Sequence, residues 1–545
     1  NKRFGYEGLA NSVLSNIESK GRNIAMMQRL GPNAKNTVQN VYNDILKVYA
    51  ENGVLADSDQ MRKLEKAIKD INTKFMPMLT GETSIPGNHM AATIESILLS
   101  IERMASLGGS AIASLFGDSV TGAMNVARME KGFSGFMTGM HEYVRAQATN
   151  IKDPAAMDEL MDTGTTFEAS LGMVASHWSQ HDAAVTKGQR GIRNVENQFF
   201  FWNGQYYVDN HARAGAAMSL NSRIGLRINK SFDEIDGGYK TLLDSHNIGK
   251  AEWDIARLST RKGFYGTDVI HIEGIKDLDV SVIDQYLAAK KIKPTKYQRT
   301  KAQDEIISRF RSMFQDQQGY QILSADARLR ANMYGGGQAG TLSSFVRKSF
   351  FQFKQFPLSY IQKALGKDIY SNAPWQDKVM NVAATVIVTT IGGYVTGMVR
   401  DALAGKTPKE FNEKTLKEAV FRGGGLGIYG DLLNQMYNDT YGTDIVTAIG
   451  GPVLRDVITT SDIGSGILQG DPKKITNSTV KLISENIPFS NIPVFKSTVD
   501  YIFMNSVKEF MNPGSLQRVE NKLQQNYDQT YWMNKPSETM LFKPR

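Results

Sequence analysis

Cysteine is absent from the 545 residues of this chain. Its absence excludes disulfide bonds, thiolate metal sites and cysteine nucleophiles together. The sequence also lacks a Gly-x-Ser-x-Gly elbow, a phosphate-binding Gly-x-x-x-x-Gly-Lys loop and an Asp-rich calcium loop. No carboxylate stands out in the apolar setting that tunes a general acid. We therefore expect no enzymatic activity, no cofactor and no metal site.

The opening stretch NKRFGYEGLANSV contains no apolar core, so we do not expect it to be a secretory signal peptide. We expect Asn1 to be an internal residue of a longer protein. Charge is moderately unbalanced: 63 Lys and Arg against 55 Asp and Glu give a net charge of +8. This balance favours contact with nucleic acid or anionic lipid. The length allows roughly two to four domains.

Apolar residues recur at helical spacing along much of the chain, as in Met61, Leu64, Ile68, Ile71 and Phe75. A cap region at Asp57–Asp59 precedes this seam, and Pro77 is expected to end the helix. We predict a mostly α-helical, elongated protein of several modules, with glycine-rich joints and one candidate membrane-inserting helix. The predicted modules are a helical module at 1–190, a less regular mixed module at 191–300, an amphipathic and hydrophobic helical module at 301–405, and a region of glycine-rich turns, helices and a polar tail at 406–545.

Several connecting segments have a predicted conformation. Asn203-Gly204 interrupts an aromatic cluster and is typical of a hairpin turn. Gly335–Gly337 is expected to be a flexible joint. Lys290–Lys301 contains six basic residues and no acidic one, and it is expected to form an exposed basic linker. The glutamine-rich tail from Gly514 is expected to be extended.

One segment, Val379–Val399, has no charged residue across 21 positions. About twenty uncharged, mostly apolar residues are what a helix needs to cross a bilayer. Its Gly393-x-x-x-Gly397 spacing allows two membrane helices to pack closely. A buried core helix of a large soluble domain is the alternative. The residues expected to mediate membrane insertion are Val379, Val386, Ile387, Val388, Gly393 and Gly397.

A run of basic and aromatic residues lies shortly before this segment. Aromatic rings and lysine stems suit a bilayer interface, with the ammonium groups reaching phosphates. The same residue types also stack on bases and neutralise DNA phosphates, or form an amphipathic helix against a core. The three readings remain open at this point. The candidate interfacial residues are Arg347, Lys348, Phe350, Phe353, Lys354 and Phe356.

Two weaker patterns are better explained by structure than by ligands. The first matches the Gly-x-Gly-x-x-Gly of dinucleotide-binding loops, but it follows a predicted helix instead of a strand. We interpret it as a close-packed glycine turn formed by Gly423, Gly424, Gly425, Gly427 and Gly430. The second is His177 and His181, which would share one helix face. Trp178 stands where a zinc protease has Glu, so a polar helix face is the favoured interpretation.

Three segments occur in a fixed order around the uncharged stretch: Gln352–Pro357 (QFKQFP), Arg422–Asp431 (RGGGLGIYGD) and Gly450–Val453 (GGPV). Together they resemble the C-terminal region of the large internal virion proteins of short-tailed bacteriophages. The resemblance covers about Ser344–Arg455. It does not extend to the N-terminal half, where relatives of this kind sometimes carry a murein-cleaving domain.

The resemblance implies a structural role in genome ejection. Such proteins lie in the capsid lumen near the portal, leave before the genome, and assemble in the host periplasm and inner membrane as a conduit for DNA. The implied partners are further copies of the chain, other internal virion or portal and tail proteins, double-stranded DNA bound without sequence preference, and the host inner membrane. Two alternatives are a capsid core or scaffold protein that never enters a membrane, and the non-catalytic part of a larger virion-associated murein hydrolase.

Overall fold

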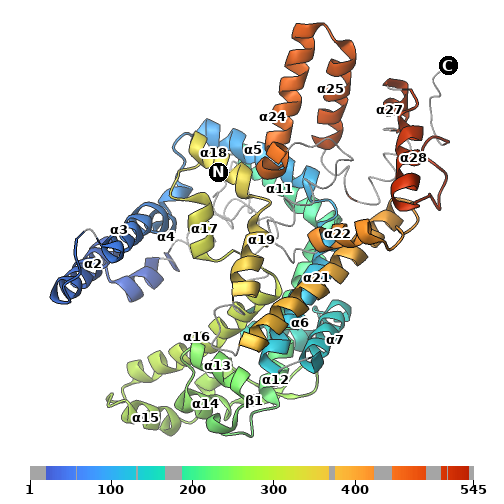
Figure 1. The fold of residues 1–545 in the computed structure, drawn as a ribbon. Coiled ribbons are helices and arrows are strands. Elements are labelled where there is room, and N and C mark those ends of the chain that lie inside the picture. Colours follow the sequence, from blue (N-terminus) through green and yellow to red (C-terminus); the bar gives the residue numbers. More distant parts are fainter. Residues whose placement is uncertain are drawn as a thin grey trace, which may run out of the picture.

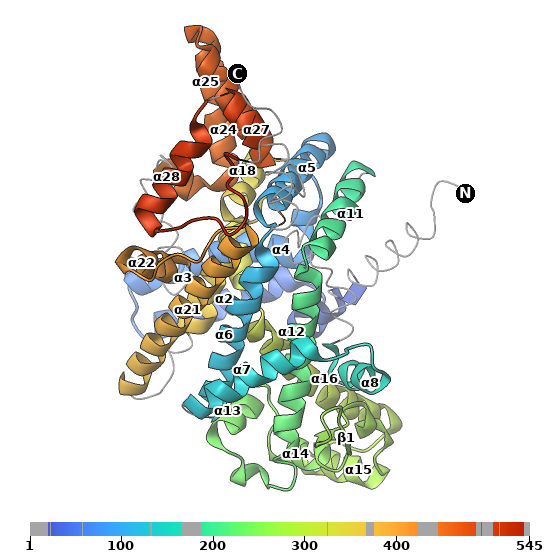
Figure 2. The same cartoon turned by 90° about the vertical axis from the view of Figure 1, so that its right-hand side faces the viewer.

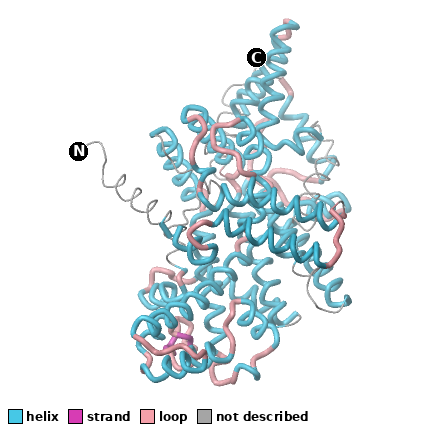
Figure 3. Tube along the Cα trace, turned by 90° about the vertical axis from the view of Figure 1, so that its left-hand side faces the viewer, coloured by secondary structure: helices cyan, strands magenta, loops and turns pink. Residues whose placement is uncertain are grey.

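The computed structural model describes residues 20–21, 23–56, 58–130, 133–165, 187–323, 325–366, 375–422, 445–486, 492, 505–511 and 513–538. Helices dominate these residues, and one short pair of strands interrupts them (Figure 3). The prediction of a mostly α-helical protein is therefore confirmed.

The N-terminal helices α2 (Ala34–Glu51), α3 (Asp59–Asp70) and α4 (Met76–Thr80) project to one side of the molecule (Figure 1). The Ser58 side chain caps α3 by accepting a 3.3 Å bond from the Met61 amide. A π-helical turn, Ile71–Phe75, joins α3 to α4. The helix therefore does not end at Pro77 as expected. Pro77 lies in the first turn of α4, where its missing N–H is tolerated.

The central helices pack closely because glycine replaces a side chain at the contacts. These helices are α5 (His89–Ser106), α6 (Ser110–Glu130), α7 (Phe133–Ala148), α8 (Pro154–Thr163), α11 (Lys187–Trp202) and α12 (Gln205–Gly225). A Cβ on Gly139 of α7 would lie 2.6 Å from the Ala123 Cα of α6. A Cβ on Gly215 of α12 would lie 2.0 Å from the Ala146 Cβ of α7. The backbones of α6, α7 and α12 therefore approach one another to distances that only glycine allows.

The turn at Asn203-Gly204 connects two helices, α11 and α12, so the hairpin prediction is wrong. Gly204 has a φ of 84°, which suits the reversal between the helices. The Asn203 side-chain amide donates 3.0 Å to the Leu107 carbonyl, which ties the turn to the end of α5. Aromatic composition alone did not distinguish a helix pair from a strand pair.

The lower lobe in Figure 1 surrounds the largest apolar core. Its elements are η3 (Phe232–Glu234), α13 (Gly237–Ser245), α14 (Lys250–Ala256), β1 (Thr260–Lys262), β2 (Asp268–Ile270), η4 (Glu273–Asp277), α15 (Val280–Ala289) and α16 (Lys296–Gln321). The strands pair antiparallel, with Arg261 opposite Val269. Trp253, Phe310 and Phe314 are fully buried in the core, and Leu220 of α12 extends it toward the central helices.

Glycines near residue 336 form a packed connection instead of a flexible joint. They link α17 (Ala327–Tyr334) to α18 (Leu342–Phe351), which is followed by α19 (Gln355–Ser359) and the π-helical turn η5 (Tyr360–Leu365). A Cβ on Gly336 would lie 2.0 Å from the Thr73 carbonyl oxygen. A Cβ on Gly340 would lie 2.4 Å from the Asn88 carbonyl oxygen. The two glycines therefore allow this segment to lie against the turn between α3 and α4 and against the start of α5.

The C-terminal region begins with α21 (Trp375–Leu403) and α22 (Glu413–Arg422). A helical hairpin, α24 (Ile445–Gln469) and α25 (Pro472–Asn486), projects from the body in both views (Figures 1 and 2). The last helices are α27 (Asn505–Met511) and α28 (Ser515–Tyr527). The prediction of an extended tail is thus wrong for Ser515–Tyr527, which is helical. The Tyr527 hydroxyl donates 2.6 Å to Glu418, so α28 packs back onto α22.

The helices do not all stop at the predicted module limits. α11 continues through residue 190, and α16 continues through residue 300. α16 also contributes to the lower-lobe core through Ile306 and Phe310 while its C-terminal end packs on α6 and α12. This long helix connects the lower lobe to the central helices.

Candidate functional site

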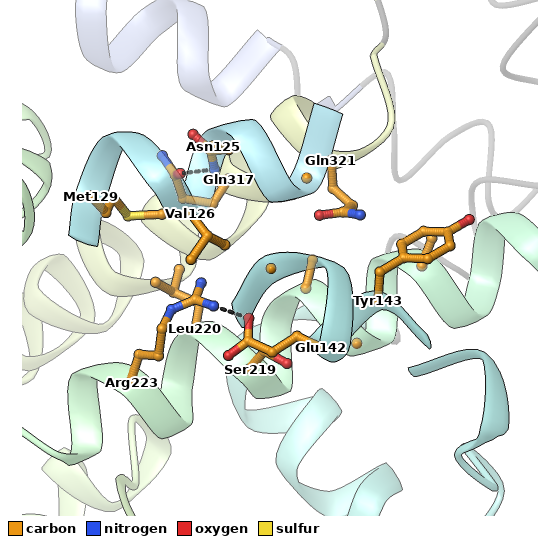
Figure 4. Close-up of a pocket in the computed structure, with 15 residues that line it drawn as sticks. Asn125, Val126, Met129, Glu142, Tyr143, Ser219, Leu220, Arg223, Gln317 and Gln321 are labelled. Atoms are coloured by element: carbon orange, nitrogen blue, oxygen red, sulfur yellow. Dashed lines mark hydrogen bonds and ion pairs between the residues drawn. The ribbon is translucent and has the colours of Figure 1, made fainter. Parts of the chain in front are cut away.

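A small cavity lies among α6, α7, α12 and α16 (Figure 4). Its volume is about 20 Å³, which is room for roughly one water molecule. Arg223 of α12 forms an ion pair with Glu142 of α7, and the Asn125 amide donates 2.9 Å to the Gln317 side-chain oxygen. These interactions fill the polar interior. The cavity is therefore a structural junction and has no space for an organic substrate.

A second set of buried polar side chains lies near this cavity, on α6, α7 and α12, and it includes two carboxylates. Asp118 of α6 and Asp209 of α12 are 3% and 5% exposed. Burial raises the pKa of Asp209 to about 6, although the Arg213 cation and the Gln205 amide favour its charged form. Burial, followed by the negative charge of Asp209, raises the pKa of Asp118 well above its ordinary value. Around pH 6 this pair therefore binds more protons than an exposed pair of aspartates would.

Tyr143 of α7 completes this buried group. Burial, with the negative charges of Asp118 and Asp209, raises the pKa of its hydroxyl, so the phenol stays neutral. The Asp118 Oδ2 atom is buried without a hydrogen-bond partner in the described chain. Proton binding by these groups couples the stability of the surrounding helices to pH.

A buried glutamate bonds to the basic-aromatic run (Arg347–Phe356), and the sequence analysis did not identify it. Glu95 of α5 accepts bonds from Lys348 Nζ at 2.9 Å, Ser344 Oγ at 3.1 Å and the Gly340 amide at 2.8 Å. Its side chain is 3% exposed. Lys348, a candidate interfacial residue, therefore lies in an internal ion pair. The sequence signal was an acidic residue within the apolar stretch of α5, which also contains Glu102.

The other candidate interfacial residues lie in and after α18. Arg347 is exposed, whereas Phe350, Phe353 and Lys354 are half-buried. The Lys354 ammonium lies 5.1 Å from the centre of the Phe350 ring, within the range of a cation–π interaction. The side chain of Phe356 lies outside the described set. These residues thus do not gather on one exposed face.

Val379–Val399 is helical, as part of α21, and it packs between α6 and α22. Within the described residues, no helix combines enough length and apolar character to cross a bilayer. The prediction of a membrane-crossing helix is therefore wrong for this segment. The physical reason lies in its composition, because Asn381, Thr385, Thr389, Thr390 and Thr396 lower its mean hydropathy.

The residues expected to insert into a membrane are divided between the faces of α21. Val379 and Ile387 are exposed, Val386 is half-buried, and the side chain of Val388 is outside the described set. Gly393 and Gly397 line a small cavity between α21 and α22, together with Lys409, Thr415 and Glu418. The small-residue spacing thus serves a helix contact inside one chain.

Two further predictions lie outside the described residues. The glycine turn at Gly423, Gly424, Gly425, Gly427 and Gly430 falls in the interval 423–444, and His177 and His181 fall in 166–186. Across the described chain, no group of three or more His, Asp or Glu side chains is arranged to hold a metal ion.

A buried ion pair joins α5 to α11 and was also missed from the sequence. Glu196 of α11 accepts 3.1 Å from Arg103 Nη2 and 2.9 Å from Ser100 Oγ. Glu196 is 1% exposed, so its charge depends on these donors. Like Glu95, it joins segments that are distant in sequence.

Comparison with known proteins adds no relative: no protein-family model, curated protein or solved structure matches the chain.

Proposed function

We propose that this chain is a structural internal virion protein that leaves the capsid during infection and helps to form a conduit for phage DNA across the host envelope. The ordered similarity of Gln352–Pro357, Arg422–Asp431 and Gly450–Val453 to proteins of that kind carries the proposal. Before infection the protein lies in the capsid lumen near the portal. Afterwards it lies in the host periplasm and at the inner membrane.

The proposed partners follow from this role. They are further copies of the chain, other internal virion or portal and tail proteins, double-stranded DNA held without sequence preference, and the host inner membrane. A chain that passes a narrow tail must unfold and refold. Helical elements rich in local contacts support that requirement, because they form rapidly. The absence of cysteine also prevents mispairing in an oxidising compartment.

A stripe of buried polar residues at α18 and α19 supports a role in which the chain changes its packing. Ser349, Gln352, Gln355 and Ser359 are spaced at helical intervals, and each is at most 6% exposed. Both side-chain polar atoms of Gln352 lack a hydrogen-bond partner in the described structure, as does Gln355 Nε2. Each buried group without a partner costs about 1–3 kcal/mol. A different packing that gave these polar groups hydrogen-bond partners would be favoured. The stripe overlaps Gln352–Pro357, the first of the three phage-like segments.

The packing of α21 favours a second candidate, a capsid core protein that remains in the particle. Gly392 of α21 faces α6, where a Cβ would lie 3.9 Å from Val120 and 4.0 Å from Phe116. Tyr394 contacts Phe411 edge-to-face, with 5.4 Å between the ring centres. A helix packed against α6 and α22 in this way suits a permanent scaffold as well as an ejected protein.

Particles assembled without this chain discriminate between the two candidates. If the chain acts in ejection, such particles contain the normal amount of genome and adsorb to cells, but no DNA enters the cytoplasm. If it is a core or scaffold protein, capsids fail to assemble or to package. Genome content is measured by quantitative PCR on nuclease-treated particles, and entry by the first transcripts from the phage genome. Restoring the chain in trans is the control.

A further inference from the structure

The turn between α15 and α16 lies at the outer edge of the lower lobe (Figure 1), and this turn and the first two turns of α16 carry exposed lysines. We call this cluster the turn lysines, and it consists of Lys291, Lys293, Lys296 and Lys301. No acidic residue occurs between positions 290 and 301. The linker was predicted to be exposed; its first half forms a short turn, and Lys296–Lys301 form the first turns of α16.

The turn lysines differ from the other basic residues of the same segment in having no partner. Lys290 donates 3.1 Å to Glu252, and Arg299 donates 2.6 and 2.8 Å to the two oxygens of Asp284. None of the turn lysines forms a side-chain hydrogen bond or ion pair with a described residue. Glu252 of α14 and Asp284 of α15 thus bond to Lys290 and Arg299. The turn lysines have no such carboxylate partner among the described residues.

The start of α16 adds to this positive charge. A helix N-terminus carries a partial positive charge from its free N–H groups, and acidic residues normally occupy the first turn. The first turn of α16 contains no acidic residue and begins with Lys296. Lysine at this place opposes the helix dipole, so helix stability does not explain its presence. An external anion would interact favourably with both the lysines and the helix end.

The turn is held in one conformation before any partner binds. The Thr295 hydroxyl caps α16 by accepting 3.2 Å from the Gln298 amide. Lys291 adopts a left-handed φ of 58°, which reverses the chain after α15. Ala302, Ile306 and Phe310 then anchor α16 in the lower-lobe core. A fixed surface of this kind loses little conformational freedom on binding.

We propose that the turn lysines, together with Tyr297, form a contact surface for the phosphate backbone of double-stranded DNA. The identity of the polyanion rests on the proposed function. Tyr297 is 70% exposed beside the lysines, where its hydroxyl can donate to a phosphate oxygen. Beyond Lys301, α16 exposes the carboxylates Asp304 and Glu305, so the positive surface ends at Lys301 and no apolar face continues it. Because an interfacial helix needs a broad apolar face, this surface fits DNA better than lipid.

The experiment measures binding of the full chain to a 30-base-pair DNA duplex by fluorescence anisotropy over a range of salt concentrations. The test variant combines Lys293→Gln, Lys296→Gln and Lys301→Gln. The matched control combines Lys63→Gln, Lys66→Gln and Lys69→Gln, which removes three exposed lysines from α3, where acidic residues alternate with basic ones. Circular dichroism melting curves establish that both variants fold like the parent.

The test variant is expected to bind more weakly to every duplex sequence. The slope of log affinity against log salt should fall by about 3, roughly one for each phosphate contact removed. The control should keep the parent slope. If the test variant binds DNA like the parent, the surface assignment is overturned while the proposed function stands. If the parent itself does not bind DNA at low salt, the DNA role in the proposed function fails too. Lost binding to vesicles of anionic lipid, with unchanged DNA binding, would also overturn the assignment.

Discussion

Lys348 donates a 2.9 Å hydrogen bond to the carboxylate of Glu95, and this ion pair joins α18 to α5. The Glu95 side chain is almost fully buried, whereas that of Lys348 is 20% exposed. Ser344 and the Gly340 amide donate to the same carboxylate. The pair therefore neutralises a charge that would otherwise be expensive to bury. It also fixes the position of the segment that precedes the phage-like motif Gln352–Pro357.

Substituting Lys348→Ala is expected to loosen α18. Removing one partner of a buried ion pair typically costs about 3–5 kcal/mol, because the other charge stays buried. Hydrogen exchange of the full chain should show faster exchange of α18 amides. The adjacent exposed Arg347→Ala is the matched control and should change protection little. Equal protection in both variants would mean that the pair does not hold α18.

Substituting Gly340→Ala is expected to displace the connection between α17 and α18. Gly340 has a φ of 79°, and an added Cβ would meet the Asn88 carbonyl oxygen at 2.4 Å. The backbone strain and the steric overlap together should lower the free energy of unfolding by about 2 kcal/mol or more. Nearby peptide bonds should then become accessible to proteases. In Gly337→Ala the nearest atom would be 3.5 Å away, so this variant should resemble the parent. If the segment were a flexible joint, both variants would be neutral or stabilising in limited proteolysis.

Asp209 should make the protein less stable as pH rises. Its pKa is raised to about 6, so the native state binds more protons than the unfolded state above pH 4. Stability therefore falls as pH increases through about 6. Asp209→Asn should be more stable than the parent at pH 8, by about 3 kcal/mol at most, and nearly equal to it at pH 4. Urea denaturation followed by tryptophan fluorescence measures the difference.

The exposed Asp244→Asn is the control for this pH dependence, since it removes a carboxylate from the surface of α13. It should follow the parent at every pH. A parent whose stability increases between pH 5 and 8, or an Asp209→Asn variant with the same pH profile as the parent, would show that Asp209 does not hold a proton in the folded chain.

Replacing Gln352 with an apolar residue should stabilise the described packing of α18. Gln352 is 3% exposed, and its amide has no partner in the described structure. Gln352→Leu removes a desolvated polar group and should raise stability by about 1 kcal/mol or more. Gln376→Leu, at an exposed position of α21, is the control and should have little effect. Thermal unfolding measures both, and a lower melting temperature for Gln352→Leu alone would contradict the assignment.

The sequence predicted helices well where apolar spacing is regular. Met61, Leu64 and Ile68 form one side of α3, and Ile306, Phe310 and Phe314 form the buried side of α16. Such patterns report which residues share a helix face. They do not report which helix that face meets. For this reason Gly393 and Gly397 were assigned to a membrane contact, although they line the junction between α21 and α22.

The buried hydrogen bonds and ion pairs of Glu95 and Glu196 could not be predicted, because the residues that form them lie far apart in sequence. Glu95 and Gly340 are separated by 245 residues, and Arg103 and Glu196 by 93. Gly336 was assigned to a flexible joint for the same reason. Its close neighbour, Thr73, lies in the turn between α3 and α4. Only the turn at Lys290–Lys301, whose exposure depends on local composition, could be placed on the surface in advance.

The protein content of particles that have released their genome tests the central claim most directly. Particles are triggered to eject in vitro, separated from full ones, and compared by quantitative mass spectrometry with the major capsid protein as the internal standard. The account predicts that this chain is abundant in full particles and lost from emptied ones, together with the DNA. Retention of the chain at its full copy number in emptied particles would contradict it and favour a permanent core protein.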